Sequence, residues 1–292
     1  MKTTKFKNWP EVQKIVRWAL EEDIGTGDIT CQYIVPEGLR VEAVILAKQP
    51  GVVAGLDVAG LVFKTVDKNI RFSPQLTDGS RVNSADVLAT VSGPARGILS
   101  AERTALNFLG RMSGIATLTS KFVAAIKGTG AKVIDTRKTT PGIRILDKYA
   151  VRIGGGVNHR FGLYDMVLIK ENHLKAAGSI TEAVRRAREA LKQFRRQGIK
   201  IEVETKTLNE VKEACSLPVD RIMLDNMRLE QIAEAVEIIR DQRLGVEIEV
   251  SGNITLENIR QIAQTSVDFI SIGMLTHSAP ALDISLLVEK IE

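Results

Sequence analysis

A chain of 292 residues, 44% of them hydrophobic and 26% charged, is long enough for one large domain or two ordinary ones with full cores. No apolar run approaches the roughly 18 residues that a membrane helix needs, and the first residues, MKTTKFKNWP, lack the apolar segment of a signal peptide. We therefore expect a cytoplasmic protein without membrane contacts. The two cysteines, Cys31 and Cys215, lie far apart without metal-ligand spacing, which indicates core thiols rather than a disulfide or a zinc site.

The first 130 residues predict a mixture of helices and strands. Pro10 begins an amphipathic helix, and the loop EDIGTGDIT follows it. Strands are expected at 40–47, 69–72 and 87–92, and a helix near 56–66. Two further helices, at 96–112 and 114–127, lead into the second half of the chain. This pattern is typical of an α+β domain.

From residue 131 onward, short runs rich in Val and Ile alternate with helical patterns. The runs lie at 132–135, 165–170, 199–204, 220–225, 245–250 and 267–273, and the helical patterns at 179–194, 208–214, 229–239 and 256–263. Such alternation indicates parallel pairing, and apolar runs indicate strands buried on both faces. Six units favour a β/α barrel, incomplete because eight strands close the standard form. A doubly wound open sheet is the alternative.

Charged and small residues follow these runs in an ordered series. In a β/α barrel the loops at the carboxyl ends of the strands converge on one site. The residues at these ends are Thr136, Arg137 and Lys138, then Lys170, Glu204, Asp225, the segment Ser251-Gly252-Asn253, and Gly273. Basic groups therefore end the early strands, carboxylates the middle ones and small residues the last two.

Each group in this series has a characteristic chemistry. Arg and Lys bind carboxylate and phosphate, whereas Glu204 and Asp225 could hold Mg²⁺ or accept hydrogen bonds from a sugar diol. The segment 251–253, followed by a helix expected to begin near Thr255, is typical of a phosphate site. Other interpretations stay open. Glu204 could be a surface carboxylate, one of Glu202 and Glu204 could line the barrel interior, and Asp225 could cap a turn.

The window from 131 to 175 is basic, with nine Lys or Arg against four acids. It contains His159 beside Arg160, after three consecutive glycines, 154–156, that indicate closely approached backbone. The ring could be a structural histidine or a ligand-binding one. A solvated basic face is the other explanation of the window, and a nucleic-acid-binding surface is a third. Aromatic residues are only 4% of the chain and form no stacking series here, which argues against nucleic acid.

The helix expected around 100–114 is apolar over most of its surface. Arg103, Asn107 and Arg111 share the remaining polar stripe at intervals of four residues. Periodicity alone does not decide whether this stripe faces water, a partner charge or a site.

Taken together, long segments of the chain resemble the quinolinate phosphoribosyltransferase (nicotinate-nucleotide pyrophosphorylase) family. The segments are EDIGTGDIT, DTRKTTPGIR, GGGVNHRFGLYDMVLIKENH, IMLDNM, EVSGNIT and ISIGMLTHSAPALDISL, and the similarity covers nearly the whole chain. It implies an α/β fold with an N-terminal α/β sandwich at 1–112, joined by the C-terminal segment 276–292, and an open seven-stranded α/β barrel at 113–275. It also implies a homodimer in which Arg103 reaches the partner's site.

The resemblance further implies the substrates and their contacts. Quinolinate and phosphoribosyl pyrophosphate would be surrounded by Thr136, Arg137, Lys138, His159, Arg160 and Lys170. Glu204 and Asp225 would face the ribose hydroxyls and Mg²⁺, directly or through water and substrate, and these two with Lys138 and Lys170 would be the catalytic groups. Ser251, Gly252, Asn253, Ile272 and Gly273 would hold the 5′-phosphate through backbone groups. Asn253 stands where the family commonly has glycine.

The implied reaction gives nicotinate mononucleotide, pyrophosphate and CO2 in NAD biosynthesis. Quinolinate carries two carboxylates and the sugar donor several phosphates, which matches the cations at the strand ends. A related barrel phosphoribosyltransferase of the ModD type, acting on another anionic ring, is an alternative. It would differ only in the residues that recognise the second carboxylate.

Overall fold

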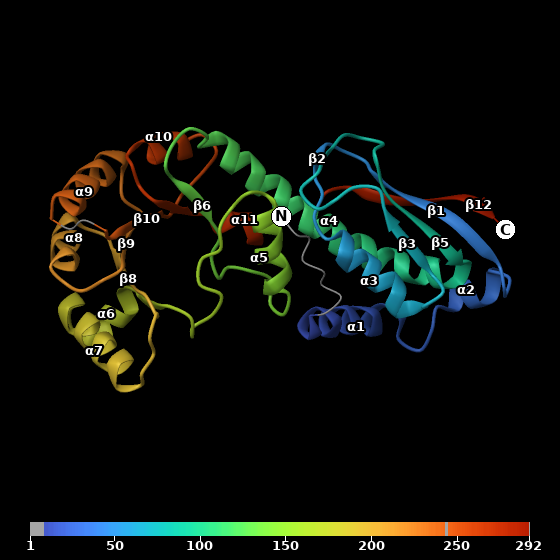
Figure 1. Cartoon of the computed structure of the whole chain (residues 1–292), viewed down its shortest axis with the longest axis horizontal. Coiled ribbons are helices and arrows are strands. Elements are labelled where there is room, and N and C mark those ends of the chain that lie inside the picture. The colour runs from blue at the N-terminus through green and yellow to red at the C-terminus, as the bar shows by residue number, and fades with distance from the viewer. Residues whose placement is uncertain (1–8, 243–244, 292) are drawn as a thin grey trace. The chain divides into compact units, whose positions relative to one another are not determined.

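The computed structural model describes residues 9–242 and 245–291 (Figure 1). By their internal contacts these residues divide into two compact units. The first contains residues up to 120, 139–155 and the residues from 274 onward, and the second contains 121–138 and 156–273. The boundary between the units falls inside one long helix, later than the boundary predicted at residues 112 and 113, and residues 139–155 return to the first unit.

A four-stranded antiparallel sheet forms the centre of the first unit, with the strand order β12-β1-β5-β3. Its strands are β1 (Arg40–Ala47), β3 (Arg71–Pro74), β5 (Val87–Pro94) and β12 (Ile284–Ile291), and a separate pair is formed by β2 (Gly51–Val52) and β4 (Arg81–Val82). The C-terminal strand β12 pairs with β1 along its whole length, from Ile284 opposite Ala47 to Ile291 opposite Val41. The chain end therefore completes a sheet begun by its first strand.

The first unit also contains helices. They are α1 (Pro10–Ile24), α2 (Ile29–Ile34), α3 (Leu56–Val66), α4 (Ala95–Ala125), α5 (Arg144–Ile153) and α11 (Met274–His277). Phe63 of α3 stacks on Phe72 of β3, with ring centroids 5.9 Å apart. Cys31 and Cys215 are both buried free thiols, as predicted. No helix in the described part of the chain is long and apolar enough to cross a membrane.

Helix α4 is continuous, so the prediction of two helices around Ser113 and Gly114 was wrong. A glycine at 114 is needed for packing rather than for a break. A Cβ there would lie 2.1 Å from the Pro280 carbonyl oxygen, and one at Gly110 would lie 2.9 Å from that of Leu282. The two glycines let the segment before β12 pass directly against the helix.

The second unit is built on a parallel sheet of six strands within the described residues, in the order β6-β11-β10-β9-β8-β7. The strands are β6 (Lys132–Ile134), β7 (Val167–Ile169), β8 (Ile201–Thr205), β9 (Arg221–Asp225), β10 (Glu247–Ser251) and β11 (Phe269–Ser271). The expected α/β fold is present. Where the resemblance implied a seventh strand, the described chain forms a single parallel bridge from Val157 to Ile134, beside β6. Edge strands β6 and β7 do not pair, so the sheet stays open.

Helices connect these strands and lie along the outer side of the sheet (Figure 1). They are α6 (Glu171–Ala177), α7 (Ile180–Gln193), α8 (Leu208–Cys215), α9 (Leu229–Gln242) and α10 (Ile259–Gln264). Ser179 and Thr207 cap α7 and α8 by accepting backbone N–H bonds from Glu182 and Glu210. Apolar side chains such as Val203, Ile222 and Ile248 alternate along the strands with charged ones. These three apolar side chains are fully buried.

The charged residues of the middle strands share the other, inner face. Strand register places Glu202 beside Arg221, and Met223 between Glu204 and Glu249. Glu202 and Glu249 are fully buried. Arg221 donates from Nη1 to the Glu249 Oε2 atom at 2.8 Å, and its guanidinium lies 4.1 Å from the centre of the Phe269 ring. The interpretation that Glu202 lines the interior is therefore confirmed.

His159 completes this group, which we call the interior cluster: His159, Glu202, Arg221 and Glu249. Its Nε2 lies 3.0 Å from the Glu202 Oε2 and 3.5 Å from the Glu249 Oε2. The Arg160 backbone N–H donates to the ring Nδ1 at 2.7 Å. A nitrogen that accepts a hydrogen bond carries no hydrogen, so this geometry assigns hydrogen to Nε2, which donates to Glu202.

Two influences act on the charge of this ring. Burial lowers the pKa of His159, but hydrogen bonds and charges from Glu202 and Glu249 raise it to about 9. The second proton could enter only at Nδ1, where the Arg160 N–H already points, so the hydrogen-bond geometry assigns a neutral ring. Burial and the Glu249 charge raise the pKa of Glu202 to about 7.

Replacing Gly154 by Ala should destabilise the protein. Gly154 ends α5 against α4, and an added Cβ would lie 2.5 Å from the Ala116 carbonyl oxygen and 2.6 Å from the Thr119 Cβ. The cost of such overpacking is about 1–3 kcal/mol. The free energy of unfolding in urea measures it. Gly130→Ala is the matched control, because nothing lies within 4 Å of its added Cβ. Equal stability of the two variants would contradict the close packing.

Replacing Glu202 by Gln should change how stability depends on pH. Folded Glu202 keeps its proton up to about pH 7, whereas the ordinary value is 4.5, so the wild type loses stability as the pH rises through this window. The Gln side chain does not titrate. The free energy of unfolding of the variant, relative to the wild type, should therefore rise between those two pH values.

Glu247→Gln is the control for this measurement. Partial burial acts to raise the pKa of Glu247, but hydrogen bonds from Lys200 and Arg221 lower it below its ordinary value. The contribution of Glu247 to the free energy of unfolding is therefore constant above pH 4.5, the ordinary pKa of Glu, and is lost only in more acidic solution. A flat difference for Glu202→Gln across the same window would show that Glu202 is ionised in the folded state.

Candidate functional site

The carboxyl ends of the six parallel strands bring the predicted site residues of the second unit to one edge of the sheet. Ser251 aligns with Asp225 on one side and with Ser271 on the other, and Ser271 aligns with Ile134. Thr136, Arg137 and Lys138 follow β6, Lys170 follows β7, and Glu204 and Asp225 lie in the last two residues of β8 and β9. We call Arg137, Lys138, Arg160, Lys170, Glu204 and Asp225 the strand-end cluster.

Two guanidinium groups of this cluster lie close enough to affect each other. Burial and the positive charge of Arg137 lower the pKa of Arg160. Arg160 donates from Nη1 to the Met166 carbonyl oxygen at 3.0 Å, and its buried Nε–H has no hydrogen-bond partner among the described residues. Two cations within electrostatic range of each other, one with a buried donor unused, can form a receptor for an anion.

Residues 136–138 form a tight connection after β6. The Lys138 N–H donates to the Thr136 Oγ1 at 3.0 Å, which turns the chain directly after the strand. Lys138 is exposed, whereas Thr136 and Arg137 are half-buried. The side chain of Thr136 thus fixes the local backbone from which the two cations extend.

Lys170 and Glu204 form an ion pair with an Nζ to Oε2 distance of 3.1 Å. The Lys170 side chain is 47% exposed and the Glu204 side chain 10%, so the pair stands at the border between the sheet interior and solvent. Asp225 accepts a hydrogen bond from the Asn226 amide at 2.9 Å. Register puts Glu204 and Asp225 on the same face of neighbouring strands, because Asp225 lies two residues beyond Met223, which is opposite Glu204.

The oxygen atoms of Glu204 and Asp225 suit a hard cation such as Mg²⁺. Because Glu204 is already paired with Lys170 and Asp225 is bonded to Asn226, the donor set fits an ion that keeps water or substrate ligands. A second group of possible ligands, His159, Glu202 and Glu249, has ligand atoms within 4.8 Å of one another. There the positive charge of Arg221 already offsets the carboxylates.

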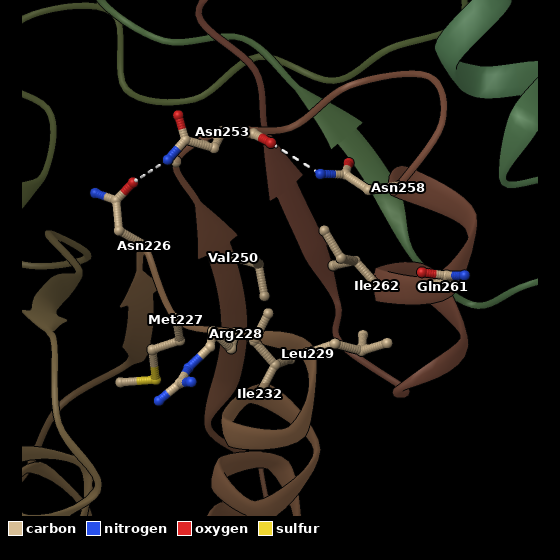
Figure 2. Close-up of a pocket in the computed structure, with 11 residues that line it drawn as sticks. Asn226, Met227, Arg228, Leu229, Ile232, Val250, Asn253, Asn258, Gln261 and Ile262 are labelled. Atoms are coloured by element: carbon tan, nitrogen blue, oxygen red, sulfur yellow. Dashed lines mark hydrogen bonds between the residues drawn. The ribbon is translucent and has the colours of Figure 1, made fainter.

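The segment Ser251-Gly252-Asn253 forms a strained turn against Asn226 (Figure 2). Gly252 and Asn253 have φ values of +94° and +53°, and a Cβ on Gly252 would lie 2.2 Å from the Asn226 Oδ1. The Asn226 N–H donates to the Ser251 carbonyl oxygen at 2.9 Å, and the Asn253 amide donates to the Asn226 Oδ1 at 3.1 Å. Asn226, at φ +55°, therefore locks the turn.

Two details of this turn differ from the sequence analysis. Helix α10 begins at Ile259, after a turn closed by the Asn258 side chain, rather than near Thr255. The dipole of this short helix therefore does not begin at residues 251–253. The Ile272 N–H donates to the Ile134 carbonyl oxygen at 3.0 Å, so sheet pairing already uses that predicted phosphate donor.

A cavity of about 280 Å³ opens beside the turn, between α9 and α10. Figure 2 shows Asn226, Asn253 and Asn258 at its polar side, and Ile232, Val250 and Ile262 below them. The cavity and the turn share Asn226, Gly252 and Asn253.

The remaining predicted residues lie elsewhere. Arg103 is exposed on α4 of the first unit, as is Asn107, whereas Arg111 donates twice to Asp147 at 2.8 and 2.9 Å. The polar stripe is thus divided between an internal ion pair and exposed side chains. Gly154, the first of three consecutive glycines, approaches α4, so the closely approached backbone there serves helix packing.

Sequence reasoning missed the roles of Glu249, Arg221 and Asp135. Asp135 is fully buried and accepts the His159 backbone N–H at 2.9 Å and an Asn158 amide hydrogen at 2.5 Å. The signal for Glu249 was present, because Glu alternates with apolar residues in both IEVE and VEIEV. In a sheet buried on both faces, such alternation indicates a charged interior.

Comparison with known proteins gives the family. The model of the quinolinate phosphoribosyl transferase C-terminal domain matches residues 115–287, and that of the N-terminal domain matches 28–113. Nicotinate-nucleotide pyrophosphorylase [carboxylating], chloroplastic, of Arabidopsis thaliana is 45% identical over 96% of this chain and 83% of its own length. A probable nicotinate-nucleotide pyrophosphorylase [carboxylating] of Synechocystis is 44% identical over 97% of this chain and 94% of its own.

Solved structures agree. NadC from Streptococcus pyogenes superposes with a TM-score of 0.90 at 39% identity, covering 100% of this chain and 99% of the other. The nicotinate-nucleotide pyrophosphorylase from Francisella tularensis gives a TM-score of 0.89 at 42% identity, covering 99% and 100%. Both family models and these full-length matches show that the chain belongs to the quinolinate phosphoribosyltransferase family.

Proposed function

We propose that the strand-end cluster is the active site in which this chain transfers a phosphoribosyl group to quinolinate. By its family the chain is a decarboxylating phosphoribosyltransferase, a pentosyltransferase of NAD biosynthesis. The observation that supports this location is the set of four cations and two carboxylates at one edge of the parallel sheet.

The two kinds of charge suit different parts of the substrates. Arg137 and Arg160, with Lys138 and Lys170, would bind the carboxylates of quinolinate and the phosphates of phosphoribosyl pyrophosphate. Glu204 and Asp225 would accept hydrogen bonds from the ribose hydroxyls. The turn at Ser251, Gly252 and Asn253, with Gly273, would hold the 5′-phosphate. Thr136 supports the cations by bonding the Lys138 N–H.

The reaction follows from these positions. The pyridine nitrogen attacks C1 of the ribose, the bond from C1 to the pyrophosphate oxygen breaks, and pyrophosphate leaves with both electrons. Mg²⁺ bound near Glu204 and Asp225 would neutralise the leaving group. The fixed cations of the strand ends stabilise the same charge without reorganising. The positive ring nitrogen then stabilises the electron pair that stays on the adjacent carbon when the neighbouring carboxylate leaves as CO2, and this carbon takes up a proton to give nicotinate mononucleotide.

The chain would act as a homodimer in the cytoplasm, with Arg103 of one protomer at the active site of the other. The support for this is that Arg103 is exposed on α4 with no ion pair among the described residues. Arg111, two turns further along the same stripe, is held by Asp147. A cation that is left exposed beside a paired one is available to a substrate of the neighbouring protomer.

Incubation with quinolinate, phosphoribosyl pyrophosphate and Mg²⁺ tests the function. CO2, pyrophosphate and nicotinate mononucleotide should appear in equal amounts. Lys138→Ala should lower kcat/KM about a hundredfold, because a contact to developing charge contributes about 3 kcal/mol. Lys175→Ala, which removes the same charge from a surface pair with Glu171, should leave activity unchanged. Turnover of another anionic ring but not of quinolinate would favour the alternative phosphoribosyltransferase.

Mixing two inactive variants tests whether protomers share their sites. Arg103→Ala and Lys138→Ala should each be nearly inactive alone. After unfolding and refolding together, a mixed dimer would contain one site with both residues intact, so up to about a quarter of the wild-type activity should return if subunits exchange at random. Each variant refolded alone is the control. Mixed dimers, demonstrated by mass, that stay inactive would contradict a shared site.

A further inference from the structure

The interior cluster, which includes the His159 ring, has no place among the substrate contacts of the proposed function. That ring was predicted to bind substrate, yet its side chain is only 5% exposed and both of its nitrogens are bonded within the chain. Nδ1 accepts the Arg160 N–H, and the hydrogen on Nε2 points to Glu202, with Glu249 slightly further away. The ring therefore has no N–H available to donate a hydrogen bond to an arriving carboxylate.

The cluster is connected to the anion receptor by the backbone. His159 and Arg160 are consecutive, so the ring that bonds Glu202 also holds the peptide from which the Arg160 side chain extends. On the other side of the same loop, Asp135 accepts the His159 N–H and stands two residues before Arg137. One set of buried hydrogen bonds therefore fixes the starting points of both guanidinium groups.

Charge balance gives a reason for burying two carboxylates here. Glu202 on β8 and Glu249 on β10 face the ring. Arg221 on β9 donates to Glu249, and Asp135 after β6 accepts the His159 backbone N–H. Arg137 and Arg160 repel each other when the site is empty. Above about pH 7, where Glu202 is ionised, its negative charge lies within range of Arg160 and offsets part of this repulsion.

We propose that Glu202 and Glu249 are positioning residues for the quinolinate site. They hold the His159 ring with its hydrogen on Nε2, and the ring fixes the Arg160 backbone so that its guanidinium stands aligned beside Arg137. His159 acts through Arg160 and does not touch the substrate. This role rests on the proposed function only in the identity of the anion that the two arginines bind.

Nitrogen NMR of the imidazole rings tests the first step without any turnover. The chain has three histidines, so in a double variant with His173→Gln and His277→Gln the remaining histidine signals belong to His159. Nδ1 should have the shift of an unprotonated acceptor and Nε2 that of a protonated nitrogen. Both shifts should stay unchanged when phthalate, an unreactive dicarboxylate probe, saturates the site. Hydrogen on Nδ1, or a change of tautomer with phthalate, would overturn the assignment.

Binding of quinolinate to Glu202→Gln tests the second step, because the two explanations predict opposite signs. Above about pH 7, where Glu202 is ionised, replacing it by Gln removes a negative charge near an anion site and should tighten binding if only Coulomb attraction matters. Loss of alignment should instead weaken it. We expect KM for quinolinate to rise about tenfold, which corresponds to about 1.4 kcal/mol, while KM for phosphoribosyl pyrophosphate changes less than twofold. An unchanged or lower KM for quinolinate would overturn the proposal.

Two further variants keep this test decisive. Glu249→Gln should act in the same direction and replaces Glu202→Gln if that variant does not fold. Glu247→Gln is the matched control, because Glu247 lies on the same strand as Glu249 and also pairs with Arg221, but it does not contact His159. A tenfold effect of Glu247→Gln would show a general weakening of the sheet and would overturn the specific role. A wild type with the expected tautomer but no turnover of quinolinate would instead contradict only the proposed function.

Discussion

The repulsion between like charges is the constraint on which this site depends. A site for a dicarboxylate and a polyphosphate must gather cations before any anion is present. The chain attaches them to the ends of buried strands, so they cannot move apart, and it places carboxylates in the sheet interior beneath them. Rigid attachment also means that little entropy is lost when the anions bind.

The same constraint explains the unusual inner face of the sheet. Burying Glu202 and Glu249 is costly unless each charge has a partner, and Arg221 and the His159 ring supply those partners. The outer face carries buried apolar side chains such as Val203 and Ile248, together with Thr205, whose hydroxyl donates to the Met223 carbonyl oxygen. The outer face of the sheet therefore stabilises the fold by apolar packing, and the inner face carries buried carboxylates that are paired with Arg221 and His159.

Neighbouring features differ in how they use backbone geometry. At residues 251–253 the turn is held by Asn226, whose side chain fills the space that a Cβ on Gly252 would need. At Gly154 and Gly114 the missing Cβ serves packing against α4 or the chain before β12. These three glycines thus serve either a close approach to α4 or a turn beside the proposed phosphate site, and only the surrounding structure separates the two.

The sequence by itself determined the parallel α/β pattern, the positions of the six strands and the charged residues at their ends, because these depend on local periodicity. It also carried the family resemblance. Only the tertiary structure decided that α4 is one helix, that a single bridge at Val157 accompanies the six strands of the described chain, and that His159 bonds inward. These features depend on contacts between residues distant in the chain, such as His159 with Glu202, and no local pattern specifies which partner a buried ring or a glycine will meet.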